Sequence, residues 1–150
     1  MTVDPSQLSA DPIRLHFSDE TRVVVTPEDE DRFVTTATEA ARACQQAQNA
    51  VAWQREFDRF LTHVFEWCSA RRETIAKSYL AFSPEGLELF LLTRGSDYRF
   101  DVDDIISELD IELAQKFPRC PTEITQLPEA PIESLHAFFD PGKSLEIYTG

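Results

Sequence analysis

The chain has 150 residues, of which 42% are hydrophobic and 27% are charged, a size and balance that fit one compact domain. Its 27 acidic and 14 basic side chains give a formal charge of −13, which argues against direct binding to a nucleic-acid backbone or an anionic membrane. No apolar run approaches the roughly 20 residues that span a bilayer, and the acidic N-terminus lacks the features of a signal peptide, so we expect a soluble cytoplasmic protein.

The N-terminal segment is predicted to be a tail followed by a hairpin. Residues 1–12 are polar, contain two prolines and show no periodicity, which favours a tail or an edge-packing arm ahead of one domain over residues 13–150. Apolar and polar side chains then alternate over residues 13–17, with the period of two that is typical of a half-buried strand. Turn residues at 18–20 precede a β-branched run at 22–25, which predicts the second strand.

A helix is expected to begin near residue 27. The hydroxyl of Thr26 can cap a free backbone N–H group, and Pro27 has the backbone angle of a first helical residue. Four acidic side chains follow where the helix dipole favours negative charge, and we also consider them as a partner-binding segment: Glu28, Asp29, Glu30 and Asp31.

Two apolar stripes divide this helical region. The first contains Phe33, Ala37, Ala40, Cys44, Ala47 and Val51, and the second contains Trp53, Phe57, Phe60, Leu61, Val64 and Cys68. At about 100° per residue, the second stripe is rotated by roughly 130° from the first. An unbroken helix over residues 27–70 would also be about 66 Å long, against a domain diameter of roughly 40 Å. We therefore predict two helices, with a break within residues 48–53, near Asn49.

The middle of the chain carries the clearest hairpin signal. Segments 77–83 and 87–94 flank a Pro-Glu-Gly turn, in which Gly86 supplies the positive φ angle. The second segment is almost uninterrupted in apolar residues, which predicts an interior strand that is covered on both faces.

The C-terminal third predicts two helices and two strands. Asp101 can cap a helix whose inner face carries Val102, Ile105, Ile106, Leu109 and Leu113. A strand over 122–127 follows and could pair in parallel with the strand before the helix. Pro131 then begins a short helix with Leu135, Phe138 and Phe139 inward, and residues 144–149 form the last strand. The order ββααββαβαβ indicates a single α+β domain with a mainly antiparallel sheet, a helical pair and two further helices.

One short motif has a catalytic interpretation. The run Phe100-Asp101-Val102-Asp103-Asp104 superficially resembles the DxD motif of haloacid-dehalogenase-type phosphotransferases, whose paired carboxylates hold Mg²⁺ and attack phosphorus. The chain departs from that pattern at Ile105, where Thr or Val is expected, and fewer than 50 residues follow to supply a lysine and further acids. The structural interpretation is that Asp101 caps the helix, while Asp103 and Asp104 complement its dipole.

Histidine and cysteine offer little further chemistry. His63 and Cys68 are five residues apart, about 140° around a helix, whereas shared ligation needs a spacing of three or four. We expect His63 to pair with Glu66, and Cys44, Cys68 and Cys120 to be unpaired structural thiols. The few glycines allow neither a P-loop nor a dinucleotide fingerprint, so no metal and no cofactor are predicted.

Charge distribution is the most informative remaining feature. Residues 1–31 carry 8 acids and 2 bases and residues 97–117 carry 7 acids and 2 bases, whereas residues 32–96 are nearly balanced. Arg55, Arg59, Arg71 and Arg72 could form a local cationic patch, and Trp53 and Trp67 are of a type enriched at interfaces. Ile111 lies about 180° from Val102 around its helix, so it would be a contact residue if exposed.

These observations favour a non-enzymatic interaction module, such as an adaptor, a regulatory subunit or an acidic inhibitor of a basic protein. The inhibitor could mimic nucleic-acid charge, which would make its partner a protein that binds DNA or RNA. The expected partner-binding residues are Asp103, Asp104, Glu108, Ile111 and Glu112, together with the acidic segment at 28–31. The alternative is a small metal-dependent hydrolase or phosphotransferase that uses Asp101, Asp103 and His63.

Overall fold

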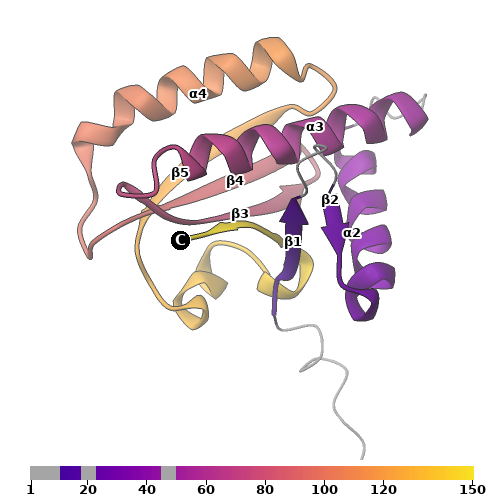
Figure 1. Ribbon diagram of the computed structural model, residues 1–150, viewed down its shortest axis with the longest axis horizontal. Coiled ribbons are helices and arrows are strands. Elements are labelled where there is room, and N and C mark those ends of the chain that lie inside the picture. Colours follow the sequence, from indigo (N-terminus) through magenta and orange to yellow (C-terminus); the bar gives the residue numbers. More distant parts are fainter. Residues whose placement is uncertain (1–10, 18–22, 45–49) are drawn as a thin grey trace, which may run out of the picture.

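The computed structural model describes residues 11–17, 23–44 and 50–150. These residues form one α+β domain with a six-stranded mixed sheet and three main helices (Figure 1). The α-helices are α2 (Glu30–Ala43), α3 (Ala50–Ser69) and α4 (Asp103–Lys116). The strands are β1 (Ile13–Phe17), β2 (Val23–Val25), β3 (Ile75–Ser83), β4 (Gly86–Thr93), β5 (Thr122–Pro128) and β6 (Leu145–Thr149). The predicted fold class and element order are confirmed, with the fourth helix replaced by a 3₁₀ turn over Ile132–Ala137, and a second such turn over Pro141–Lys143 precedes β6.

The sheet has the strand order β2-β1-β6-β3-β4-β5. Its antiparallel pairs are the two predicted hairpins, β1–β2 and β3–β4, and the pair β3–β6. The pair β4–β5 is parallel, as expected for a strand–helix–strand crossover through α4. The second parallel pair, β1–β6, joins the two ends of the chain and was not predicted.

The sheet is covered on both faces. All three α-helices lie on one face, and the C-terminal segment with its 3₁₀ turns covers part of the other (Figure 1). Strand β4 shows the two faces directly, because Leu87, Leu89 and Leu91 face the helices while Phe90 and Leu92 face the C-terminal segment. The prediction of an interior strand buried on both faces is confirmed.

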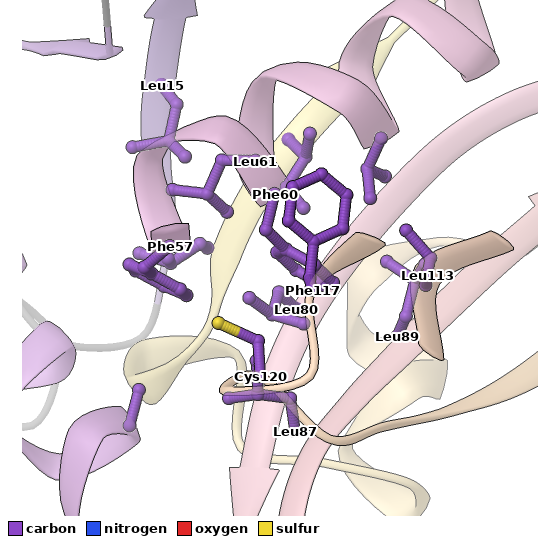
Figure 2. Close-up of a cluster of buried hydrophobic side chains, with 14 of the residues drawn as sticks. Leu15, Phe57, Phe60, Leu61, Leu80, Leu87, Leu89, Leu113, Phe117 and Cys120 are labelled. Atoms are coloured by element: carbon purple, nitrogen blue, oxygen red, sulfur yellow. The ribbon is translucent and has the colours of Figure 1, made fainter. Parts of the chain in front are cut away.

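Helix α3 supplies the centre of the main core. Phe57, Phe60 and Leu61 are completely buried against the sheet, among leucines of β3 and β4 (Figure 2). Phe117, just after α4, meets Phe60 edge to face with ring centroids 5.8 Å apart. Trp53 and Trp67 are also buried, so neither tryptophan is an exposed interface residue.

The predicted break between two helices is confirmed, although its position differs. Helix α2 ends at Ala43 with Cys44 as its C-cap, and α3 begins at Ala50. Residues 50–53 are therefore helical and the predicted interval extended too far along the chain, while Asn49 lies outside the described residues. In Figure 1 the two helices run in clearly different directions, as the rotated apolar stripes require.

The turn between β3 and β4 depends on its glycine. Gly86 has a φ of 141°, and a Cβ atom placed there would lie 2.9 Å from the carbonyl oxygen of Pro121. Leu87 N–H donates to that same oxygen at 2.9 Å, so the hairpin is fixed to the start of β5. A side chain at residue 86 would separate these two segments.

Three local predictions were wrong. Asp101 does not cap α4, because residues 100–102 form a 3₁₀ turn and Val102 occupies the N-cap position without a side-chain cap. The hydroxyl of Thr26 donates to the Asp29 carboxylate at 3.3 Å and caps no backbone N–H group. Phe138 is exposed, whereas its neighbour Phe139 packs inward on Phe90. None of the helices in the described part of the chain has the length and apolarity needed to cross a membrane.

Candidate interaction surface

An exposed aromatic pair lies between β4 and α4. The rings of Tyr98 and Phe100 meet edge to face with centroids 4.8 Å apart. Tyr98 is 44% exposed and Phe100 is 80% exposed, which is unusual for side chains of this size and apolarity. The pair therefore presents apolar area to solvent at the start of α4.

A buried glutamine holds this aromatic segment in place. The Gln126 carboxamide on β5 accepts from the backbone N–H of Arg99 at 3.0 Å and donates to the Asp103 carboxylate at 3.0 Å. The Tyr98 hydroxyl donates to the same carboxylate oxygen at 2.6 Å. These bonds link the strand, the loop and the helix, so the aromatic pair is presented in a defined orientation.

The carboxylate of Asp101 binds the guanidinium of the nearby Arg99. The guanidinium contacts both carboxylate oxygens, at 2.8 Å and 3.3 Å. This hydrogen bonding holds the pKa of Asp101 below its usual range and raises that of Arg99. Asp101 and Asp103 therefore both have protein partners, the first in Arg99 and the second in Tyr98 and Gln126.

The outer face of α4 is acidic and carries an exposed isoleucine. Asp104, Glu108 and Ile111 follow one another at spacings of four and three, which places them on one stripe of the helix. Ile111 is 58% exposed, as its angular position predicted, while Val102 on the opposite side is buried. Asp104, Glu108 and the nearby Asp110 make no ion pair with any residue that the structure describes. Their charges are available to a partner.

Glu112 faces a different set of groups at the far end of α4. Its carboxylate accepts from Lys116 Nζ at 2.9 Å and lies 3.4 Å from Nε2 of His63 on α3. The hydrogen bond from Lys116 is the main cause of a lowered pKa for Glu112, and His63 adds to it. His63 is thus paired with Glu112 of the neighbouring helix, and the predicted pair with Glu66 was wrong.

The candidate catalytic residues are not brought together. His63 lies beside Glu112, which is nine residues after Asp103 and so about 14 Å away along α4. No group of three His, Cys, Asp or Glu side chains within the described ranges is placed so that it could hold a metal ion. Asp101 and Asp103 therefore lie at the N-terminal end of α4, whereas His63 on α3 lies beside its C-terminal end.

Comparison of the chain with known proteins identifies no related family. No protein-family model matches the chain, and neither the curated proteins nor the solved structures yield a match. The surface must be interpreted from its own side chains.

The two acidic segments do not form one surface. Glu30 and Asp31 begin α2 at the corner of the molecule opposite α4, and Glu28 lies in the 3₁₀ turn just before it (Figure 1). Asp29 is paired with Arg32 at 3.3 Å, and Arg32 also donates to the carbonyl oxygen of Gly142. A single small partner could therefore engage one segment or the other.

The expected arginine patch is also divided. Arg55 and Arg59 lie in the first half of α3, whereas Arg71 and Arg72 follow its C-terminus. Arg71 stacks on the Trp67 ring at 4.3 Å, which is an internal contact that fixes the end of the helix.

Tyr98, Phe100 and Gln126 are not among the site residues expected from the sequence. A signal was present, since Tyr98 and Phe100 are two aromatic residues in an otherwise polar loop after Gly95. The role of Gln126 left no such signal, because it depends on how β5 aligns with β4.

We expect the pKa of Tyr98 to lie above the ordinary value of about 10, because its hydroxyl donates to Asp103 and tyrosinate would face a carboxylate. The substitution Asp103→Asn should lower the pKa of Tyr98 towards that ordinary value. A pH titration of the tyrosine ring resonances by NMR would measure it. Asp104→Asn is the matched control and should leave the pKa of Tyr98 unchanged; an equal shift in both variants would show that the hydrogen bond is not its cause.

Proposed function

We propose that this chain is a non-enzymatic interaction module that binds a basic protein segment through the α4 surface, defined as Tyr98, Phe100, Asp104, Glu108, Asp110 and Ile111. The observation that carries the proposal is the combination of exposed apolar side chains with carboxylates that have no partner among the described residues. Of the seven large hydrophobic side chains exposed in the described ranges, three belong to this one segment.

The apolar part of the surface would supply affinity. Burying an exposed phenylalanine contributes about 1.5–3 kcal/mol, and aromatic residues are enriched among those that dominate binding energy. Tyr98 is already held by Asp103, so less conformational entropy is lost when a partner contacts the pair. The faces of both rings also suit the side chain of an arginine or lysine.

The acidic part of the surface would supply selectivity for a basic partner. Residues 97–117 carry 7 acids and 2 bases, and the two bases are engaged with Asp101 and Glu112. Such a field accelerates association with a cationic segment and is screened beyond about 8 Å at physiological ionic strength. The expected partner is therefore a protein segment with several Lys or Arg residues and at least one apolar side chain that can reach the aromatic pair.

A charge variant tests the electrostatic part of the proposal. In Asp104→Asn/Glu108→Gln/Asp110→Asn, Asp103 and Glu112 are left in place because they hold Tyr98 and His63. With an arginine-rich peptide as the probe, we expect association to slow by about 3- to 10-fold at low salt and the difference to shrink at high salt. Stopped-flow fluorescence of a labelled peptide would measure the rates.

The matched control removes equal charge from the other acidic segment. Glu28→Gln/Glu30→Gln/Asp31→Asn spares Asp29, which is paired with Arg32, and should bind the peptide at nearly the wild-type rate. Equal slowing in the two variants would mean that only the net charge of the protein attracts the peptide. That result would overturn the assignment of the α4 surface.

A further inference from the structure

Strands β1 and β6 pair over a short distance and then diverge inside the sheet. Their parallel register ends at the pair Arg14–Glu146, whereas β1 continues to Phe17 and β6 continues to Thr149. The pairing of β6 with β3 skips Ile147, and such a bulge bends a strand. In Figure 1, β1 and the yellow C-terminal strand run in clearly different directions. A gap therefore opens between two strands that are neighbours in the sheet.

This gap leads into a hollow of about 380 Å³, which we call the β1–β6 cleft. Its lining consists of residues 14–17 of β1, Phe65 of α3, and residues 146, 147 and 149 of β6. Arg14 and His16 are exposed on the face of the sheet opposite the helices, while Phe65 lies on the helix side and stacks on Phe17 with ring centroids 4.5 Å apart. The cleft thus combines an apolar inner side with a polar mouth, as ligand pockets of about 300–1,000 Å³ commonly do.

The strand edges beside the cleft carry backbone groups that no strand pairs. The N–H of Ile13 points to the β6 side, where it donates to a carbonyl oxygen at 3.0 Å, so by alternation Phe17 directs its backbone groups to the same side, beyond the last β1–β6 pair. The N–H of Gly150 donates to the Ala76 carbonyl of β3 at 2.8 Å, so Thr149 directs its own backbone groups away from β3 and towards the cleft. Such groups normally find a partner when they are partly buried. Within the described residues no strand pairing supplies one.

The guanidinium of Arg14 stands at the mouth of the cleft. Its side chain is 78% exposed, and its ion pair joins Nε to the Glu146 carboxylate at 3.9 Å. The two terminal nitrogens donate no hydrogen bond to any residue that the structure describes. A planar guanidinium suits a carboxylate that binds both nitrogens, and the negative charge elsewhere on the protein is screened beyond about 8 Å. The mouth is therefore suited to an acidic side chain.

We propose that the β1–β6 cleft binds an extended segment of a partner protein, which adds as a strand to the free edge of β1. The part of β1 beyond the last pair is about 10 Å long at about 3.3 Å per residue, so roughly three residues of the segment pair with it. Because side chains alternate across a strand, apolar side chains of the segment face Phe65 while the acidic residues between them face Arg14. This segment differs in charge and position from the basic segment proposed for the α4 surface, and its binding does not depend on that function.

Titration of the intact, isotope-labelled protein with a synthetic peptide tests the proposal by NMR. The probe is Gly-Asp-Leu-Asp-Leu-Asp-Gly with blocked ends. We expect the largest chemical-shift changes at the amides of Phe17 and Thr149, and slower exchange of these amides with solvent. The matched control peptide has the same side chains but N-methylated central amides, which cannot pair as a strand, and it should bind at least about tenfold more weakly.

Variants of the protein separate this cleft from general attraction of an acidic peptide. Arg14→Gln should weaken binding of the probe by about tenfold and remove its preference over a peptide with asparagine in place of aspartate. Arg55→Gln is the matched control, because Arg55 is exposed in the first half of α3 and does not line the cleft, and it should bind the probe as the wild type does.

Four results would overturn the proposal. They are equal binding of the N-methylated peptide, an equal loss of affinity in Arg14→Gln and Arg55→Gln, shift changes confined to α4, and no shift change at millimolar concentrations of the probe.

Discussion

Replacement of Phe60 by alanine is expected to destabilise the protein by about 3–5 kcal/mol. The side chain is completely buried and lies between two other rings, with centroids 6.3 Å from Phe57 and 5.8 Å from Phe117. Its removal leaves a cavity where α3, the sheet and the end of α4 meet (Figure 2). Since a domain of this size has a free energy of unfolding of about 5–15 kcal/mol, the loss would be a large fraction of the total.

Urea unfolding followed by circular dichroism would measure this effect, and Phe100→Ala is its control. Phe100 is mostly exposed and contacts only the Tyr98 ring among the aromatic residues described, so its loss should change the free energy of unfolding by less than about 0.5 kcal/mol. The same substitution should weaken binding of a basic peptide by about tenfold if the ring is a principal contact. A large destabilisation by Phe100→Ala would show that the ring is structural.

The fold could be predicted where local chemistry determines it. The β3–β4 hairpin follows from a turn glycine and the apolar segments on either side of it, and β4 is interior because both of its faces are apolar. The break between α2 and α3 follows from the phase of the apolar residues alone. Each of these features is encoded in one continuous stretch of the sequence.

Pairings between distant segments could not be predicted in this way. The parallel pair β1–β6 joins residues more than 120 apart in the sequence, and no local pattern specifies its register. The hydrogen bond from the Arg119 N–H to Glu56 has the same origin, because it depends on how the turn after α4 reaches α3. Asp101 is expected from its position to cap the helix, but it lies within a 3₁₀ turn that precedes α4, and its carboxylate binds Arg99.

The geometry of the proposed α4 surface was predictable only in part. The exposure of Ile111 and of the acids on the outer face of α4 follows from helical periodicity. The sequence could not show that Asp103 would bind Tyr98 and Gln126, or that Glu112 would pair with His63 and Lys116. Both of these carboxylates, which the sequence predicts to face a partner, also make contacts within the protein.

Replacement of Glu56 by alanine is expected to destabilise the protein by about 2–4 kcal/mol. This effect is unusually large for a glutamate, because most glutamates lie at the protein surface. The carboxylate is buried and bonded to the backbone N–H of Arg119, and that donor would lose its partner. Thermal or urea unfolding would measure the change. Glu66→Ala, an exposed position on the same helix, should stay within about 0.5 kcal/mol and serves as the matched control.

The substitution Glu56→Gln separates the hydrogen bond from the charge. The amide oxygen can still accept from the Arg119 N–H, whereas the ion pair with the half-exposed guanidinium is lost, so we expect a cost of only about 1 kcal/mol. If Glu56→Gln is as destabilising as Glu56→Ala, the charge and not the backbone hydrogen bond holds the turn. In the opposite case the neutral acceptor is sufficient, and the turn that carries Arg119 should keep its place in the glutamine variant while losing it in the alanine variant.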